Sequence, residues 1–93
     1  MRFEWDERKN EENVRKHGFD FADAPEIFDS PVLALLDDRQ DYGEDRWTGV
    51  GRLHDEVVVV VFTERDDGEI TRIISLRKAT KYERQGYEKS LAH

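Results

Sequence analysis

The residues best able to do chemistry are basic side chains near the end of the chain. From residue 72 onward, six Lys and Arg residues face two Glu residues, while the first 71 residues carry a net charge of −11. One basic region on an acidic protein offers anions such as phosphates a place to bind. The alternative is that these cations are solvated or paired with the acidic body. The candidate phosphate ligands are Arg72, Arg77, Lys78, Lys81 and Arg84.

A strand followed directly by a helix must position these cations. The two-residue period of a strand over 69–77 places Arg72 and Arg77 on opposite faces. Thr80 and Glu83 have the spacing of a capping box that begins a helix extending to about residue 91. Lys81 lies in the first turn, where the helix dipole disfavours a cation. Free backbone amides beside Lys81 would form a phosphate site there.

Two further places in the sequence could transfer protons. His17 is a candidate because histidine is the side chain type suited to proton exchange near neutral pH, although a histidine followed by Gly18 is also a common way to end a helix. Glu44 and Arg46, at the start of a strand, could supply an acid or base next to a phosphate clamp. The other acidic residues of 37–45 are best explained as a solvated loop.

We expect no metal and no cofactor. The chain has no cysteine, and its histidines lack partners at metal-ligand spacing. The acidic loop is not a calcium loop, because Arg39 and Tyr42 occupy positions that need a ligand and a glycine. The longest apolar run is six residues, against roughly 20 for a membrane span, and the N-terminus lacks the apolar stretch of a signal peptide. These features predict a cytoplasmic protein with no membrane partner.

The hydrophobic pattern predicts one α+β domain over residues 1–93. The unbroken apolar run at 57–62 predicts a central strand covered on both faces. Gly49 and Gly51 predict a bulge or a close backbone approach in the strand before it. We expect an antiparallel sheet, a four-stranded meander plus a short N-terminal strand, packed with two N-terminal helices and one C-terminal helix. The expected strands are 2–5, 32–36, 46–53, 56–64 and 69–77, and the expected helices are 6–16, 20–30 and 80–91.

Four stretches of the chain, in order, resemble the BrnT family of small toxins from type II toxin–antitoxin pairs. They are FEWDERKNEENVRKHGFDF, DYGEDRWTGVG, FTER and RIISLRKATKYERQGYEK. The resemblance implies a RelE-like fold, ribonuclease activity that inhibits translation, and neutralisation by a BrnA-like ribbon-helix-helix antitoxin. It also implies that operator DNA is bound only through the toxin–antitoxin complex. By position it points to His17, Glu44, Arg46, Arg65, Arg72, Arg77, Lys81, Glu83 and Tyr87.

These observations predict a metal-independent endoribonuclease that acts on an RNA substrate. Fixed cations would hold the phosphate while His17 or Glu44 moves protons. The expected catalytic residues are His17, Glu44, Arg46, Arg72, Arg77 and Lys81. The expected RNA-binding residues are Arg65, Lys78, Arg84 and Tyr87. The alternative is a non-catalytic protein-binding module that acts only through its partner complex in operator-DNA autoregulation.

Overall fold

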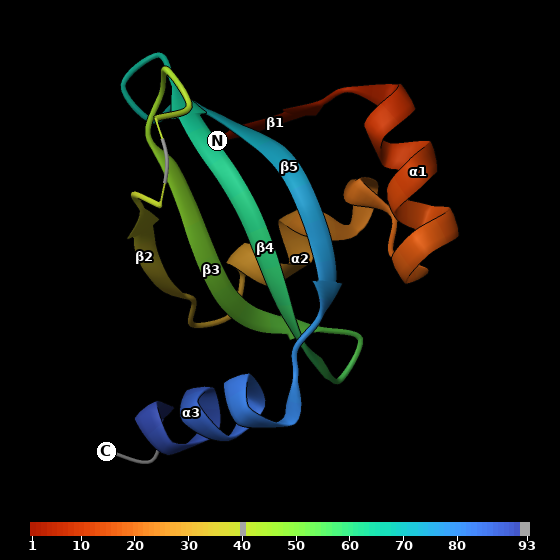
Figure 1. Ribbon diagram of the computed structural model, residues 1–93, viewed down its shortest axis with the longest axis vertical. Helices are drawn as coiled ribbons and strands as arrows, with labels where there is room; N and C mark the ends of the chain where they lie inside the picture. Colours follow the sequence, from red (N-terminus) through yellow and green to blue (C-terminus); the bar gives the residue numbers. More distant parts are fainter. Residues whose placement is uncertain (40, 92–93) are drawn as a thin grey trace.

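The protein is a five-stranded sheet with helices on one face and at one end (Figure 1). The computed structural model describes residues 1–39 and 41–91. The strand order is β1-β5-β4-β3-β2, which confirms the expected α+β class. Along the chain, the elements of the described residues are β1 (Arg2–Trp5), α1 (Glu7–His17), a 3₁₀ turn (Phe21–Asp23), α2 (Ala24–Phe28), β2 (Leu33–Asp37), β3 (Arg46–Leu53), β4 (Glu56–Arg65), β5 (Ile70–Lys78) and α3 (Lys81–Leu91).

The sheet is mixed, and the expectation of a wholly antiparallel sheet is wrong at one edge. Strands β2 to β5 pair antiparallel with their neighbours in chain order. Strand β1 pairs in parallel with β5, in a register that places Glu4 beside Arg72. A parallel pair needs a long connection, and here everything from α1 to β4 separates the two strands.

The core lies between α2, the 3₁₀ turn and one face of the sheet. Fully buried Phe21 and Ile27 pack there against apolar side chains of β4 and β5. A Cβ atom at Gly51 would lie 2.8 Å from Cγ2 of Ile27, so only glycine lets α2 approach β3 this closely. The pairing of β3 with β4 runs without a register shift. Close backbone approach, rather than a bulge, therefore explains these glycines.

Two buried asparagines attach the polar helix α1 to the rest of the fold. The side chain of Asn13 donates to the carbonyls of Phe19 and Leu76 and accepts from the Leu76 amide. Asn10 accepts from the Phe21 amide and donates to Asp20. Beyond Ile73 no β1 residue pairs with β5, so Asn13 takes the place of a neighbouring strand at Leu76.

The second face of the sheet is covered only at one end, by α3 (Figure 1). Tyr87 of α3 is buried there, with 1% of its surface exposed, and its hydroxyl donates to the carbonyl of Pro31. No described helix lies over the remainder, which we call the open face. None of the described helices is long and apolar enough to cross a membrane. The open face is formed by Arg46, Thr48, Val61, Thr63, Arg72, Ser75 and Arg77, with Leu33 and Leu35 of β2 at its margin.

Candidate functional site

A β-bulge in β5 decides which basic residues share the open face. Val61 of β4 pairs with Ser75, but the next residue, Phe62, pairs with Ile73, so Ile74 is an extra residue in β5. An extra residue shifts the alternation of side chains by one position. Arg72 and Arg77 therefore lie on the same face, and the expectation that they lie on opposite faces is wrong.

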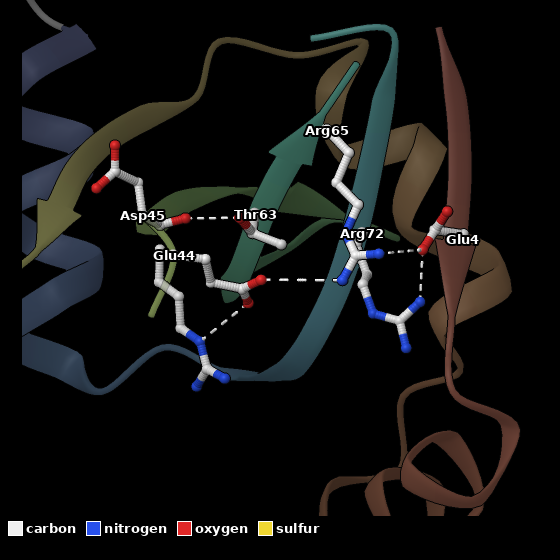
Figure 2. Close-up of polar contacts among 7 residues, drawn as sticks. Glu4, Glu44, Asp45, Thr63, Arg65 and Arg72 are labelled. Carbon is white, nitrogen blue, oxygen red and sulfur yellow. Dashed lines mark hydrogen bonds and ion pairs between the residues drawn. The ribbon is translucent and has the colours of Figure 1, made fainter. Parts of the chain in front are cut away.

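Three arginines and two glutamates form a chain of alternating charges on the open face (Figure 2). Oε2 of Glu4 accepts a hydrogen bond from Nη1 of Arg72 and lies 3.9 Å from Nη1 of Arg65. Nη2 of Arg65 lies 3.8 Å from Oε1 of Glu44, whose Oε2 lies 3.7 Å from Nε of Arg46. We call these five residues the arginine–glutamate cluster. It joins β1, β3, β4, β5 and the loop before β3.

Local contacts hold the Glu44 end of the cluster in place. The hydroxyl of Thr63 donates to the carbonyl of Asp45 at 2.6 Å, which ties the loop to β4 (Figure 2). The guanidinium of Arg46 lies 4.1 Å from the ring centroid of Tyr42, in cation–π geometry.

Most guanidinium donors in the cluster are not used in hydrogen bonds. The separations of 3.7–3.9 Å around Arg46 and Arg65 are ion pairs, too long for hydrogen bonds. Among the described residues, neither of these two side chains donates a hydrogen bond, and Nε of Arg46 is buried without a partner. Within the cluster, only Arg72 is hydrogen-bonded to a carboxylate. The cluster therefore retains the donors that a phosphate needs.

Arg77 has a structural role at the start of α3. It donates two hydrogen bonds to Glu83, at 2.8 and 2.9 Å. Glu83 also accepts from the Thr80 amide, and Thr80 Oγ1 accepts from the Glu83 amide, which confirms the capping box. The hydrogen bonds from Arg77 are the main reason that the pKa of Glu83 falls to about 2. The same contact raises the pKa of Arg77.

The expected clamp of Arg72, Arg77 and Lys81 does not form. Arg72 and Arg77 are separated by four steps along β4, roughly 13 Å at about 3.3 Å per residue, and each is paired with a different glutamate. Lys81 is exposed at the start of α3. The structure brings together Arg46, Arg65, Arg72 and Glu44 of the expected site residues.

His17 and Lys78 lie away from the cluster. Both line a cavity of about 510 Å³ at the C-terminal end of α1, together with His54. His17 also borders a smaller cavity of about 260 Å³, which reaches Ser75 at the edge of the open face. Neither of these two cavities is lined by Glu44 or by another residue of the arginine–glutamate cluster.

The two α3 residues expected to bind RNA, Tyr87 and Arg84, are engaged in contacts within the protein. Tyr87 is buried, so its ring cannot stack on a base, and that expectation is corrected. Tyr82, one turn earlier, is instead 86% exposed. Arg84 lies 3.5 Å from Glu88 within the same helix. No apolar stripe in α3 marks in advance which tyrosine packs against the sheet.

Glu4 is the member of the cluster that the sequence did not reveal. Alternation in RFEW places Glu4 on the face opposite Phe3 and Trp5, which was the only available signal. Its contacts with Arg65 and Arg72 depend on the parallel pairing of β1 with β5. That pairing joins residues about 68 positions apart in the chain.

A comparison with protein families gives a match over most of the chain. The family model described as the ribonuclease toxin BrnT of type II toxin–antitoxin systems matches residues 5–83. The matched region contains four of the five residues of the cluster, and Glu4 lies just before it. No curated protein matches the chain in sequence. Among the described residues, no three His, Asp or Glu side chains gather as metal ligands. The matched region covers most of the 93 residues, so the chain belongs to the BrnT family of type II toxin–antitoxin ribonuclease toxins.

Proposed function

We propose that this BrnT protein is an endoribonuclease that cleaves RNA on its open face, with the scissile phosphate held by the arginine–glutamate cluster. The observation that carries the proposal is the set of three guanidinium groups with unused donors around Glu4 and Glu44. A guanidinium binds two phosphate oxygens at once, which favours arginine over lysine in such a site. Family membership supports the choice of RNA as the anion.

Glu44 is the proposed proton acceptor. It lies between Arg46 and Arg65, so a phosphate held by these two arginines brings the neighbouring ribose close to its carboxylate. Glu44 takes the proton from the 2′-hydroxyl, the 2′-oxygen bonds to phosphorus, and the bond from phosphorus to the 5′-oxygen breaks. Water on this exposed face protonates the leaving 5′-oxygen. The arginines stabilise the additional charge on phosphorus, and the reaction needs no metal ion.

The proposal extends to the biological setting that the family suggests. In this setting the protein is a RelE-like toxin, and its cleavage of messenger RNA inhibits translation. A BrnA-like ribbon-helix-helix antitoxin neutralises the toxin and carries the complex to operator DNA. An acidic chain with a net charge of −7 is poorly suited to contact duplex DNA by itself. The support for this setting is the family match.

Cleavage of purified RNA in the presence of EDTA tests the proposed reaction. We expect the wild type to cut, and Arg72→Ala and Glu44→Gln each to lower kcat/KM by about 100-fold, as for other lost electrostatic or acid–base groups. Arg15→Ala, which changes an exposed arginine of α1, is the matched control and should cut normally. A wild-type protein that cuts nothing would instead favour the non-catalytic binding module. Cleavage that stops with EDTA would contradict the metal-independent mechanism.

A further inference from the structure

The edge strand β2 is unusually apolar. It pairs with β3 along one side only, and no described strand pairs with its other side. Its leucines are exposed to different degrees: Leu35 by 76%, Leu36 by 48% and Leu33 by 40%. The register places Leu33 and Leu35 on the open face, whereas Leu36 lies on the opposite face beside Trp47. Both sides of this edge are therefore apolar.

Proteins normally protect an edge strand from pairing with other chains. Charged side chains, proline, a bulge or a covering loop are the usual means. Residues 33–36 are LALL and contain none of these protecting residues, and their pairing with β3 shows no bulge. A free row of backbone amides and carbonyls between exposed leucines is the arrangement to which extended peptides add as a further strand.

Charge indicates what kind of segment fits this edge. Residues 37–45, which are the last residue of β2 and the segment after it, contain five acidic residues against one arginine. Arg39 is engaged by Asp37 at 2.9 Å, which leaves the exposed Asp38 and Asp41 without an ion pair among the described residues. Lysine or arginine in the added strand would be favoured at this end. A second copy is disfavoured, because antiparallel pairing of two β2 strands would bring each acidic loop towards Asp29 of the other copy.

A groove leads from β2 across the open face. It has a volume of about 500 Å³, and its lining includes the apolar side chains of Leu35, Val59 and Val61. Arg77 and Glu83 line its far side, near α3. A polypeptide that continues from the β2 edge into this groove would cover the open face. It would thereby block access of RNA to the face that carries the arginine–glutamate cluster.

We propose that β2 is the docking strand for the antitoxin of this toxin. The antitoxin adds an extended segment to the β2 edge, with apolar side chains against Leu33, Leu35 and Leu36 and a basic residue near Asp38. Membership of a type II toxin–antitoxin family indicates that the partner is an antitoxin. The exposed leucines and the acidic residues beside β2 indicate where it binds and which side chains it presents. The inference rests on the proposed function only where it says that the antitoxin blocks access of RNA. The binding of the antitoxin to β2 is measured without RNA and does not depend on that function.

Titration of each toxin variant with its co-encoded antitoxin tests the docking strand. Leu35→Lys should weaken binding at least ten-fold, because a lysine replaces an apolar contact at the centre of the edge. Leu91→Lys is the matched control, since Leu91 of α3 is also exposed, by 41%, and should leave affinity unchanged. Thermal unfolding checks that both variants fold. Equal affinities of Leu35→Lys and wild type would overturn the proposal.

Hydrogen exchange and charge reversal provide independent readouts. Amides of residues 33–37 should gain protection when the antitoxin binds, and unchanged exchange there would overturn the proposal. Asp38→Lys should weaken binding, whereas Glu11→Lys on α1 should not. A free toxin that is dimeric through β2, and becomes monomeric in Leu35→Lys, would show that a second copy occupies the edge and would also overturn it. If wild-type toxin cuts no RNA but these binding results hold, the proposed reaction fails while the docking strand stands.

Discussion

In the proposed site, Glu4 places a carboxylate oxygen where a phosphate oxygen would bind. A single atom, Oε2, meets guanidinium nitrogens from both Arg65 and Arg72. Phosphate makes the same kind of contact with paired arginines. In the free toxin Glu4 therefore neutralises the site and keeps the two arginines directed toward one point. RNA must displace this carboxylate or share the arginines with it.

Glu4→Gln should bind RNA about five-fold more tightly than wild type. Removing one negative charge about 4 Å from a bound phosphate relieves roughly 1 kcal/mol of repulsion in water. Binding of RNA in which every ribose is 2′-O-methylated measures this step without cleavage. Glu11→Gln, on the exposed surface of α1, controls for the change in net charge. Weaker binding by Glu4→Gln would mean that Glu4 chiefly positions the arginines.

The cluster was only partly predictable from the sequence. The sequence indicates Glu44 and Arg46 as an acid or base beside a cation, and Arg72 as part of the basic region, whereas Arg65 follows only from the family resemblance. Glu4 was missed, and Arg77 was assigned to the phosphate although it holds Glu83. Which acid pairs with which arginine depends on contacts between segments that are distant in the chain. Composition and residue spacing do not predict these contacts.

At the scale of elements, local signals were reliable and pairing signals were not. Asp6 accepts from the amides of Arg8 and Lys9, and Gly18 adopts a φ of 77°, so the ends of α1 follow from two residues. The only local sign of the bulge is the adjacent apolar pair Ile73 and Ile74, which interrupts the alternation but does not show which residue is extra. A bulge depends on how two strands meet, and one extra residue reversed the faces assigned to the residues beyond it.

Asn13→Ala should lower the free energy of unfolding by about 2–4 kcal/mol. The substitution removes three hydrogen bonds and leaves the buried amide and carbonyl of Leu76 without partners. Urea denaturation of the two proteins measures the difference. Glu12→Ala, at the exposed neighbouring position, should change stability by less than about 0.5 kcal/mol. A loss below about 1 kcal/mol for Asn13→Ala would show that α1 docks mainly through other contacts.

For the whole molecule, the proposed function confines the attraction for RNA to a small area of an acidic protein. The net charge of −7 repels a polyanion at long range, but at physiological salt this repulsion is screened beyond about 8 Å. Affinity must then come from short-range contacts with the cluster. Its three arginines set an upper limit on the number of phosphates that are neutralised there.

The salt dependence of RNA binding should therefore be shallow. Each phosphate neutralised on a single strand contributes a slope of about −0.7 to log K against log salt, so three arginines predict about −2. Arg72→Ala should reduce the slope to about −1.4. Lys78→Ala, which removes a cation beside His17 rather than in the cluster, should leave it unchanged. Titration of 2′-O-methyl RNA from 50 to 300 mM salt measures the slopes. A wild-type slope steeper than about −4 would require phosphate contacts well outside the open face, and an equal effect of Lys78→Ala would place one of them at the His17 cavity.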